Sequence, residues 1–445
     1  MSHCAIFDIG KTNKKFVIFD ADHQEVYHEY TQFEERIDED GFPCDDIEAL
    51  QQWVVGTLQQ ALQNPNFKIH SLNVSAHGAS FVHVDKQGQL IPPLFNYLKP
   101  YPEDLLARFY QQYGDPEVFA QETASPPLGM LNSGLQLYWL KYAKPHLFQQ
   151  IRWSFHLPQF VSYLLTGIPY SDYTSIGCHT GLWDFDKHAY HRWVYEEQID
   201  RLLPPIAHTH TTNQQRINGQ EISVGIGIHD SSAALVPYLQ LQQDPFLVLS
   251  TGTWNIALNP FNQVGLTAEE LQQDCLQFMR IDGQPVKASR LFLGHEYQVW
   301  TKRLAEYFHQ SPTAHQFIKP DASILQQLSD YPARTFRWDS IPCRHELPVE
   351  SRLDQFASFS IAYHKLMQEL VELQTRALLL VQGDKAVQRL YVEGGFVDNQ
   401  LFLHFLHQAF KDSEISATST PFGSAIGAAI VVDSSSSGID HLTTT

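Results

Sequence analysis

Two short segments of the chain share one pattern, and this repeat limits the possible folds more than any other feature. The first reads CAIFDIGKTNKKFVIFD (residues 4–20) and the second PFLVLSTGTWNIALNP (residues 245–260). In each, an apolar run ends in a turn that contains glycine, and a second β-rich run follows, which is the pattern of a β-hairpin. The repeat predicts two related domains.

The length agrees with two domains. The chain has 445 residues, which exceeds the size at which a single hydrophobic core stops growing. We expect one domain over residues 1–240 and another over residues 241–433, joined by a polar linker at residues 239–244 (LQLQQD). The Ser- and Thr-rich segment 434–445 has little to bury, so we expect a disordered tail there.

The composition excludes several classes of partner. A formal net charge of −19 argues against a nucleic-acid partner, because such proteins bind through clustered Lys and Arg. We expect no membrane partner, because no apolar stretch approaches the roughly 20 residues that span a bilayer. The five cysteines are far apart and odd in number, and the N-terminus does not resemble a signal peptide. These features favour a cytoplasmic protein with reduced thiols.

The two hairpin turns are suited to phosphate. A turn of Gly, Thr and Asn between strands presents backbone N–H groups and hydroxyls to one concave surface, and such a surface suits phosphate oxygens. The first turn covers residues 8–12 and the second residues 251–253. Two such turns on two domains predict a nucleotide site between the domains, although each could also be an ordinary structural turn.

A further strand is expected to end in a carboxylate. Ile222, Val224, Ile226 and Ile228 alternate with small residues and lead into Asp230, and we expect a helix over residues 231–236 that Pro237 stops. A residue at such a strand-to-helix junction can be exposed in a cleft, and the helix N-terminus favours its ionised form. Capping of the helix is the alternative role.

Five motifs now stand in one order along the chain: DIGKT (8–12), HG (77–78), IGIHDSSAAL (226–235), LSTGTW (249–254) and EGGFVDNQLFLHFLHQAF (393–410). Together they resemble the FGGY family of carbohydrate kinases, and the resemblance extends from about Ala5 to Val432. It implies an α/β fold in which two ribonuclease H-like domains of the actin ATPase type flank a cleft for ATP and sugar. The implied reaction is phosphorylation of a ketose or polyol hydroxyl.

The resemblance and the chemistry of phosphoryl transfer assign two carboxylates. The reaction needs a group that receives the hydroxyl proton and a metal that spreads the charge of the γ-phosphoryl. We expect Asp230 to be the general base. We expect Asp8 to hold Mg²⁺, directly or through water, since this ion prefers one or two carboxylates beside the phosphates. An ordinary turn Asp is the alternative for Asp8.

The remaining assignments concern ATP and the sugar. The expected ATP-binding residues are Gly10, Lys11, Thr12, Asn13, Thr251, Gly252, Thr253, Gly394, Gly395 and Asn399, the last three at the adenosine. The family usually has Thr where Lys11 stands, so this side chain either contacts phosphate or turns to solvent. The expected sugar-binding residues are His77, Gly78, Asn96, Tyr97 and Asp230. A structural histidine is the alternative for His77.

The sugar itself is left open by the motifs. The turns GIHD and LSTGTW are most similar to the rhamnulokinase and fuculokinase branch, whereas residues 77–79 (HGA) are closer to the xylulokinase pattern. We therefore expect a 6-deoxyketohexose such as L-rhamnulose or L-fuculose, or a pentulose such as xylulose. The oligomeric state also stays open, with a homodimer as one option.

Two other classes of protein share parts of this pattern. An actin-like or chaperone-like ATP-switching protein would share the phosphate turns, but it would not need Asp230 beside a sugar-binding His-Gly turn. A sugar sensor that has lost catalysis would be expected to lack Asp8 or Asp230. Both carboxylates are present.

Overall fold

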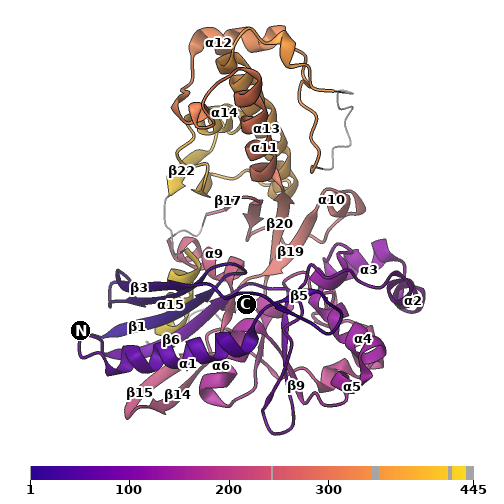
Figure 1. Cartoon of the computed structure of the whole chain (residues 1–445), viewed down its shortest axis with the longest axis vertical. Coiled ribbons are helices and arrows are strands. Elements are labelled where there is room, and N and C mark those ends of the chain that lie inside the picture. Colours follow the sequence, from indigo (N-terminus) through magenta and orange to yellow (C-terminus); the bar gives the residue numbers. More distant parts are fainter. Residues whose placement is uncertain (1, 242–243, 342–349, 419–422, 437–445) are drawn as a thin grey trace.

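The computed structural model describes residues 2–241, 244–341, 350–418 and 423–436, and these form two units stacked along the long axis of the molecule (Figure 1). Each unit is built around one mixed β-sheet with helices packed against it. None of the helices in the described ranges is both long and apolar enough to cross a membrane.

The sheet of the first unit has seven strands in the order β14-β15-β6-β1-β2-β3, with β16 paired to β6. β1 is parallel to β6, and β6 is parallel to β15 and β16, whereas the hairpins β1-β2, β2-β3 and β14-β15 are antiparallel. The strand bounds are β1 His3–Ile9, β2 Lys14–Phe19, β3 Glu25–Thr31, β6 Ile69–Ala76, β14 Thr212–Ile217, β15 Gln220–Gly225 and β16 Ile228–His229.

Alternate residues of β1 face two different cores. Phe7 and the other residues on the same face of β1 pack against α1 (Ile47–Gln63) and α6 (Leu157–Thr166). Cys4 and Ile6 face α9 (Asp230–Leu241) and α15 (Gly423–Ser436) on the other side. A strand that is apolar on both faces is what a sheet covered by helices on both sides requires.

A further subdomain extends from the first sheet and has its own aromatic-rich core, in which Phe109, Tyr138 and Trp193 are fully buried. Its three-stranded sheet contains β7 Phe81–Val84, β8 Leu90–Ile91 and β9 Trp153–His156. Its main helices are α2 Glu103–Tyr113, α3 Pro116–Thr123, α4 Ser133–Ala143, α5 Pro145–Phe148 and α8 Arg192–Glu196. The remaining short elements of the first unit are β4 Arg36–Ile37, β5 Pro43–Cys44, β10 Ser171–Asp172, α7 Tyr173–Ile176, β11 Trp183–Asp184, β12 Ala189–Tyr190, β13 Ile206–Ala207 and the 3-10 turns Gly129–Leu131 and Ile199–Arg201.

The second unit repeats the hairpin and the parallel strand of the first. β17 is antiparallel to β18 and parallel to β21, as β1 is to β2 and to β6. Both predicted hairpins are therefore confirmed. Its sheet has the order β19-β20-β18-β17-β21-β22, with bounds β17 Phe246–Thr251, β18 Asn255–Asn259, β19 Cys275–Met279, β20 Pro285–Leu291, β21 Arg389–Gly394 and β22 Glu414–Thr418.

Helices α11, α13 and α14 enclose the core of the second unit above this sheet (Figure 1). Trp300, Leu366 and Phe402 bring one side chain from each of these helices into that core. The helix bounds are α10 Ala268–Gln272, α11 Leu293–Tyr307, α12 Ala322–Gln327, α13 Phe359–Gln382 and α14 Gln400–Ala409, with 3-10 turns at Ala314–Phe317, Leu328–Asp330 and Leu353–Gln355.

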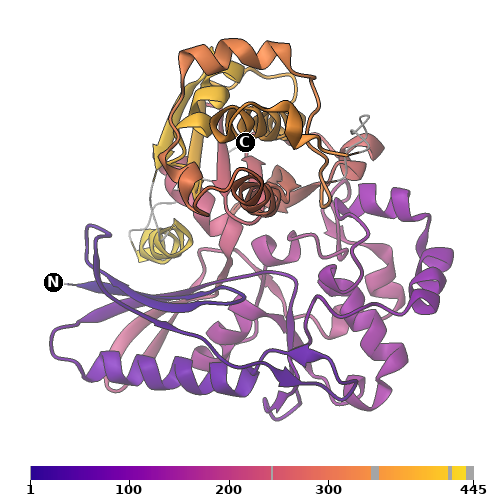
Figure 2. The same cartoon turned by 45° about the horizontal axis from the view of Figure 1, so that its top comes forward.

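Helix α15 follows the second unit in sequence but packs in the first. It lies against α9, β6 and β1, and Figure 2 shows it in yellow beside the indigo strands. Ala425, Ala428 and Val432 share a core with β1 and β2. The expectation that these residues belong to the second domain is corrected, because the apolar face of α15 packs against β1 and β2 of the first unit. The expected tail begins within α15, and residues 437–445 lie outside the described residues.

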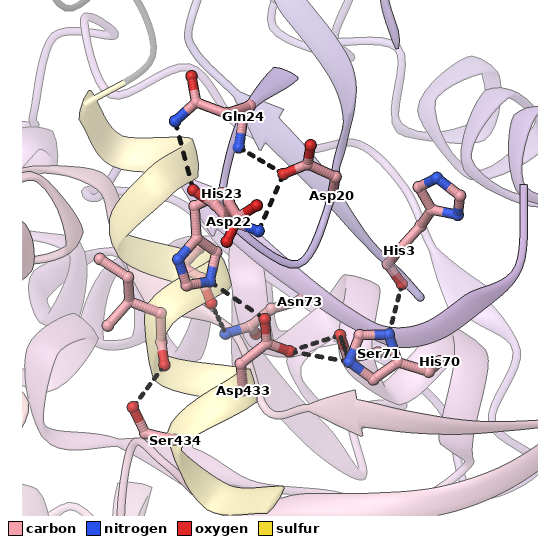
Figure 3. A network of polar contacts seen from close by, with 12 residues as sticks. His3, Asp20, Asp22, His23, Gln24, His70, Ser71, Asn73, Asp433 and Ser434 are labelled. Atoms are coloured by element: carbon pink, nitrogen blue, oxygen red, sulfur yellow. Dashed lines mark hydrogen bonds and ion pairs between the residues drawn. The ribbon is translucent and has the colours of Figure 1, made fainter. Parts of the chain in front are cut away.

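A network of polar contacts fixes α15 on the first sheet (Figure 3). The Asp433 carboxylate accepts a hydrogen bond from Ser71 Oγ at 2.7 Å, and it lies 3.1 Å from His23 Nε2 and 3.3 Å from His70 Nε2. Asn73 Nδ2 donates to the Ala428 carbonyl at 2.9 Å. These contacts join α15 to β6 and to the turn between β2 and β3.

Three local expectations around α9 are corrected. The strand that leads to Asp230 is interrupted between β15 and β16, although both pieces pair with β6. Helix α9 does not stop at Pro237 but continues to Leu241, so the predicted linker begins inside a helix. Proline removes the N–H that would bond the Ala233 carbonyl, and that carbonyl faces Gly427 of α15, where an added Cβ would stand 1.8 Å from it. The neighbouring helix thus covers the backbone that the proline leaves open.

Candidate functional site

Three side chains from distant parts of the sequence meet at one edge of the first sheet. Asp8 lies near the end of β1, His77 directly follows β6, and Asp230 directly follows β16. The strands β1, β6 and β16 are parallel neighbours, with Asp8 opposite Ser75 and His229 opposite Ala76. Because parallel strands present their carboxyl ends at the same edge, the three side chains are brought together.

Asp230 is held by local contacts. Its Oδ1 accepts hydrogen bonds from the Ser231 N–H at 2.6 Å and the Ser231 hydroxyl at 3.3 Å, and it lies 3.2 Å from His229 Nε2. Burial raises the pKa of Asp230, and the nearby His77 and the bonds from Ser231 only partly oppose it. The net shift therefore favours the protonated form, opposite to the shift expected from the helix N-terminus. A carboxylate with a raised pKa is a stronger base.

Asp8 has the environment of a cation ligand. Ser424 Oγ of α15 donates to its Oδ1 at 3.0 Å. Burial raises the pKa of Asp8, Lys15 opposes that shift, and the negative charge of Asp230 adds to it. Within the described ranges no group of three or more His, Cys, Asp or Glu residues could hold a metal ion. A hard cation that takes most of its ligands from phosphates and water needs only one or two carboxylates, so Asp8 fits Mg²⁺.

The tip of the first hairpin presents backbone donors. Gly10 N–H bonds the Asn13 carbonyl at 3.0 Å and closes the turn. In the described part of the chain, the N–H groups of residues 11–13 have no acceptor, and Thr12 and Asn13 are exposed. This geometry is the one expected of a phosphate turn.

The Lys11 side chain is not turned to solvent, which is one of the two arrangements expected for it. Its Nζ donates to Asp45 Oδ2 at 2.5 Å and lies 5.5 Å from the centre of the Tyr97 ring. The ammonium group is therefore paired, not turned to solvent, and it points toward the residues expected to bind sugar.

The four other sugar-site residues of the sequence analysis divide into two pairs. The rings of His77 and Tyr97 lie 6.0 Å apart, and burial lowers the pKa of His77. Asn96 is buried, and its side-chain oxygen accepts from Leu98 N–H at 3.0 Å, which shapes the turn that carries Tyr97. Gly78 packs so closely against Cys178 that a Cβ would stand 2.5 Å from the sulfur. The side chains of His77 and Tyr97 are therefore the ones placed to contact a ligand, whereas Asn96 and Gly78 determine the path of the backbone.

A pocket of about 600 Å³ lies in the second unit. Gly252, Thr253, Gly395 and Asn399, all identified from the sequence, are among its lining residues. Residues that the sequence analysis missed also line it: Gly294, Tyr297, Gln298, His315, Gln316, Ile318, Lys319, Tyr363, Phe396, Asp398 and Gln400. Most of the missed residues come from α11, α13 and the segment 314–319, whose helical patterns carry no motif.

The turns beside this pocket are held by backbone contacts. Gly394 has φ of +88°, and a Cβ there would stand 1.9 Å from the Thr251 carbonyl, so only glycine fits. Thr251 is not among the lining residues, because its hydroxyl donates to the Glu393 carbonyl at 2.5 Å and accepts from Phe396 N–H at 3.0 Å.

Asn399 caps helix α14 and is tied into the pocket wall. Its Oδ1 accepts from Phe402 N–H at 3.0 Å, and its Nδ2 donates to Tyr363 Oη at 2.9 Å. Each end of the side-chain amide therefore makes a contact within the protein, and the amide also hydrogen-bonds Tyr297, which partly opposes the rise in the pKa of that tyrosine.

Known families and proteins match both parts of the chain. Residues 4–236 match the N-terminal domain of the FGGY family of carbohydrate kinases, and residues 243–345 match a carbohydrate kinase FGGY C-terminal domain. A rhamnulokinase from Yersinia pestis (strain Pestoides F) is 26% identical over 400 residues, covering 84% of this chain and 76% of the relative.

Solved structures share the fold. A carbohydrate kinase from Novosphingobium aromaticivorans superposes with a TM-score of 0.77 at 24% identity, covering 97% of this chain and 93% of that one. A xylulose kinase from Rhodospirillum rubrum superposes with a TM-score of 0.79 at 15% identity, covering 98% and 90%.

Proposed function

Because this chain belongs to the FGGY family of carbohydrate kinases, whose members use ATP, we propose that it phosphorylates a hydroxyl group of a ketose, with Asp230 as general base and Mg²⁺ at Asp8. One observation carries the proposal: Asp8, His77 and Asp230 lie at the ends of three adjoining parallel strands. A hydroxyl beside Asp230 and a phosphate beside Asp8 would then lie next to each other.

The contacts of Asp230 indicate which atom accepts the proton. Its hydrogen bonds with Ser231 and its contact with His229 all fall on Oδ1, among the residues that the structure describes. Oδ2 is therefore the atom available to the acceptor hydroxyl. In the transfer, the hydroxyl O–H bond breaks toward Oδ2, its oxygen bonds the γ-phosphorus, and the bond from that phosphorus to the β-γ bridging oxygen breaks.

Asp8 and the two turns would hold the other half of the reaction. When bound, Mg²⁺ spreads the negative charge that develops on the phosphoryl oxygens. The N–H groups of residues 11–13 and the turn at Gly252 and Thr253 would contact the phosphates. The adenosine would occupy the pocket beside Gly395 and Asn399. Since these groups lie on two units, the reacting atoms meet when the units close around both substrates.

The relatives favour a ketose. The relative at 26% identity is named a rhamnulokinase, which supports a 6-deoxyketohexose such as L-rhamnulose or L-fuculose. A pentulose such as xylulose is the second choice, on the residues 77–79 (HGA). The xylulose kinase structure supports the fold alone, because its identity is low.

A coupled ADP-release assay tests the acceptor. The panel contains L-rhamnulose, L-fuculose, D- and L-xylulose, D-ribulose, D-fructose, glycerol and the matching aldoses. We expect one ketose to give the highest kcat/KM, because a missing hydroxyl leaves buried polar partners unpaired at about 1–3 kcal/mol each. If glycerol or an aldose is the best acceptor, the ketose assignment is wrong. If no sugar raises ADP release, the kinase assignment is wrong, and the protein is an ATP-switching protein or a sugar sensor.

We also propose a cytoplasmic location for the enzyme, and a homodimer stays a prediction. The support for the location is that Cys4, Cys44, Cys178 and Cys275 are all buried free thiols. Cys343 lies outside the described residues. Buried thiols that never pair are usual in a reducing compartment.

A further inference from the structure

The backbone of Lys11 is part of the predicted phosphate turn, but its side chain points toward Asp45. Its Nζ lies 2.5 Å from Asp45 Oδ2 and 3.9 Å from Glu35 Oε1. The side chains of Lys11 and Asp45 are 23% and 17% exposed. Both charged groups are therefore partly exposed and can be reached by a ligand.

The ion pair continues a row of groups that leads to the base. Lys11 Nζ lies 5.5 Å from the centre of the Tyr97 ring, and this ring lies 6.0 Å from that of His77. His77 follows the strand that lies between those of Asp8 and Asp230. Burial raises the pKa of Tyr97, and the charges of Asp45 and Asp230 add to that shift. The charges of Asp45 and Asp230 both act on His77 and on Tyr97, so these two rings lie near the ion pair as well as near the base.

We propose that the Lys11–Asp45 pair is a recognition element for the sugar acceptor, in which Lys11 Nζ donates to one hydroxyl and the Asp45 carboxylate accepts from its neighbour. This inference rests on the kinase function proposed above. A donor and an acceptor held at hydrogen-bond distance match two adjacent hydroxyl groups of a sugar, each of which can accept and donate. His77 and Tyr97 would contact the remaining faces of the sugar between this pair and the base.

The charges around the proposed sugar site favour binding of an uncharged acceptor. The carboxylates of Asp8, Glu35, Asp45 and Asp230 lie among these groups, and so do the ammonium groups of Lys11, Lys14 and Lys15. Lys14 is turned toward the backbone, since its Nζ donates to the Lys11 carbonyl at 2.8 Å. The triphosphate of ATP adds further negative charge. A sugar acid would bring another carboxylate into this field, so we expect sugar acids to be rejected.

The test compares Lys11→Met, Asp45→Asn and the double variant with wild type. We expect each single change to raise KM for the best acceptor about tenfold to a hundredfold, on the scale of one buried hydroxyl left unpaired. KM for ATP should stay within about twofold. Because the two residues act as one unit, the double variant should lose less than the product of the two single losses. Each single variant should also stop discriminating against one deoxy analogue of the acceptor.

Lys141→Met is the matched control. Lys141 pairs with Glu197 at 2.6 Å and is 28% exposed, so it resembles Lys11 in geometry but lies on α4. We expect this variant to keep wild-type KM values and selectivity. Thermal unfolding of all variants separates recognition from folding: a loss of thermal stability that accompanies unchanged selectivity would assign the pair a structural role and overturn the inference.

Three further outcomes are distinguishable. If Lys11→Met raises KM for ATP and leaves that of the acceptor unchanged, Lys11 contacts phosphate and the inference fails, while the kinase function stands. If wild type prefers an aldonic acid to every neutral sugar, the selection for uncharged acceptors is refuted. If wild type phosphorylates no sugar of the panel, the proposed function itself fails.

Discussion

Replacing Gly427 with alanine would test whether the contact between α15 and α9 positions the base. An added Cβ at Gly427 would stand 1.8 Å from the Ala233 carbonyl oxygen, which is backbone and cannot rotate away. Carbon and oxygen atoms normally approach no closer than about 3.3 Å, so the two helices would have to separate by about 1.5 Å. Helix α9 begins at Asp230, and a separation of this size would displace the base.

The magnitudes follow from this displacement. Overpacking a close contact costs about 1–3 kcal/mol, which corresponds to a fall in Tm of several degrees for a unit of this size. A misplacement of about 1 Å at a reacting group costs about 10²-fold in rate. We therefore expect Gly427→Ala to lower Tm by about 2–12 °C and kcat by about 10²-fold.

The assay combines scanning calorimetry with coupled ADP release, and Gly56→Ala is the control. Gly56 also lies inside a helix, α1, but a Cβ there meets nothing within 4 Å. Alanine is a better helix former than glycine by about 1 kcal/mol, so this control should be as stable as wild type or slightly more so. A Gly427→Ala variant that matches Gly56→Ala in Tm and kcat would refute the contact between the two helices.

Further predictions concern the base, its titration, closure and a buried carboxylate. Asp230→Asn should lower kcat about 10²-fold or more with nucleotide binding retained, and more than half of wild-type turnover would remove Asp230 from the mechanism. Because burial raises the pKa of Asp230, kcat/KM should fall on acidification through a pKa above that of an ordinary aspartate, and a flat acid limb in the pH profile would contradict the role. The preferred sugar should stimulate ADP release at least about tenfold. The protein with this sugar and a non-hydrolysable nucleotide should be more compact in small-angle scattering than with either omitted. An ADP-release rate that no sugar changes, but that a protein partner or self-assembly raises, would favour an actin-like switch. Burial raises the pKa of Glu369 from 4.5 to about 7, so between these pH values the folded protein keeps a proton that the unfolded chain releases. The free energy of unfolding should therefore fall as pH rises from 4.5 to 7. Urea unfolding of Glu369→Gln should show a weaker dependence of this free energy on pH, and an unchanged dependence would assign it to other groups.

The sequence was sufficient for the parts of the site that depend on local pattern. Both hairpin turns and the junction at Asp230 are short motifs in which strand, turn and helix signals adjoin, so their positions could be predicted. The pocket wall at Tyr297, Lys319 and Tyr363 could not, because these residues lie on segments that approach one another only in the folded second unit.

Other features depended on contacts that no local pattern encodes. Helix α15 is rich in small and apolar residues, which predicts burial but does not indicate the sheet against which the helix packs. Pro237 normally indicates the end of a helix, yet α9 continues because α15 packs over the opened backbone. The orientation of Lys11 depends on Asp45, which lies 34 residues away.

The docking of α15 on the first strands also affects how this protein is completed on the ribosome. A nascent chain that has emerged through residue 418 contains both sheets, yet Cys4, Ile6 and Val17 still lack the helix that covers them. Domains of a nascent chain generally fold in the order of their synthesis. Here the second unit can close its core while the first still exposes apolar strands, so the part made first matures last and depends longest on protection by chaperones.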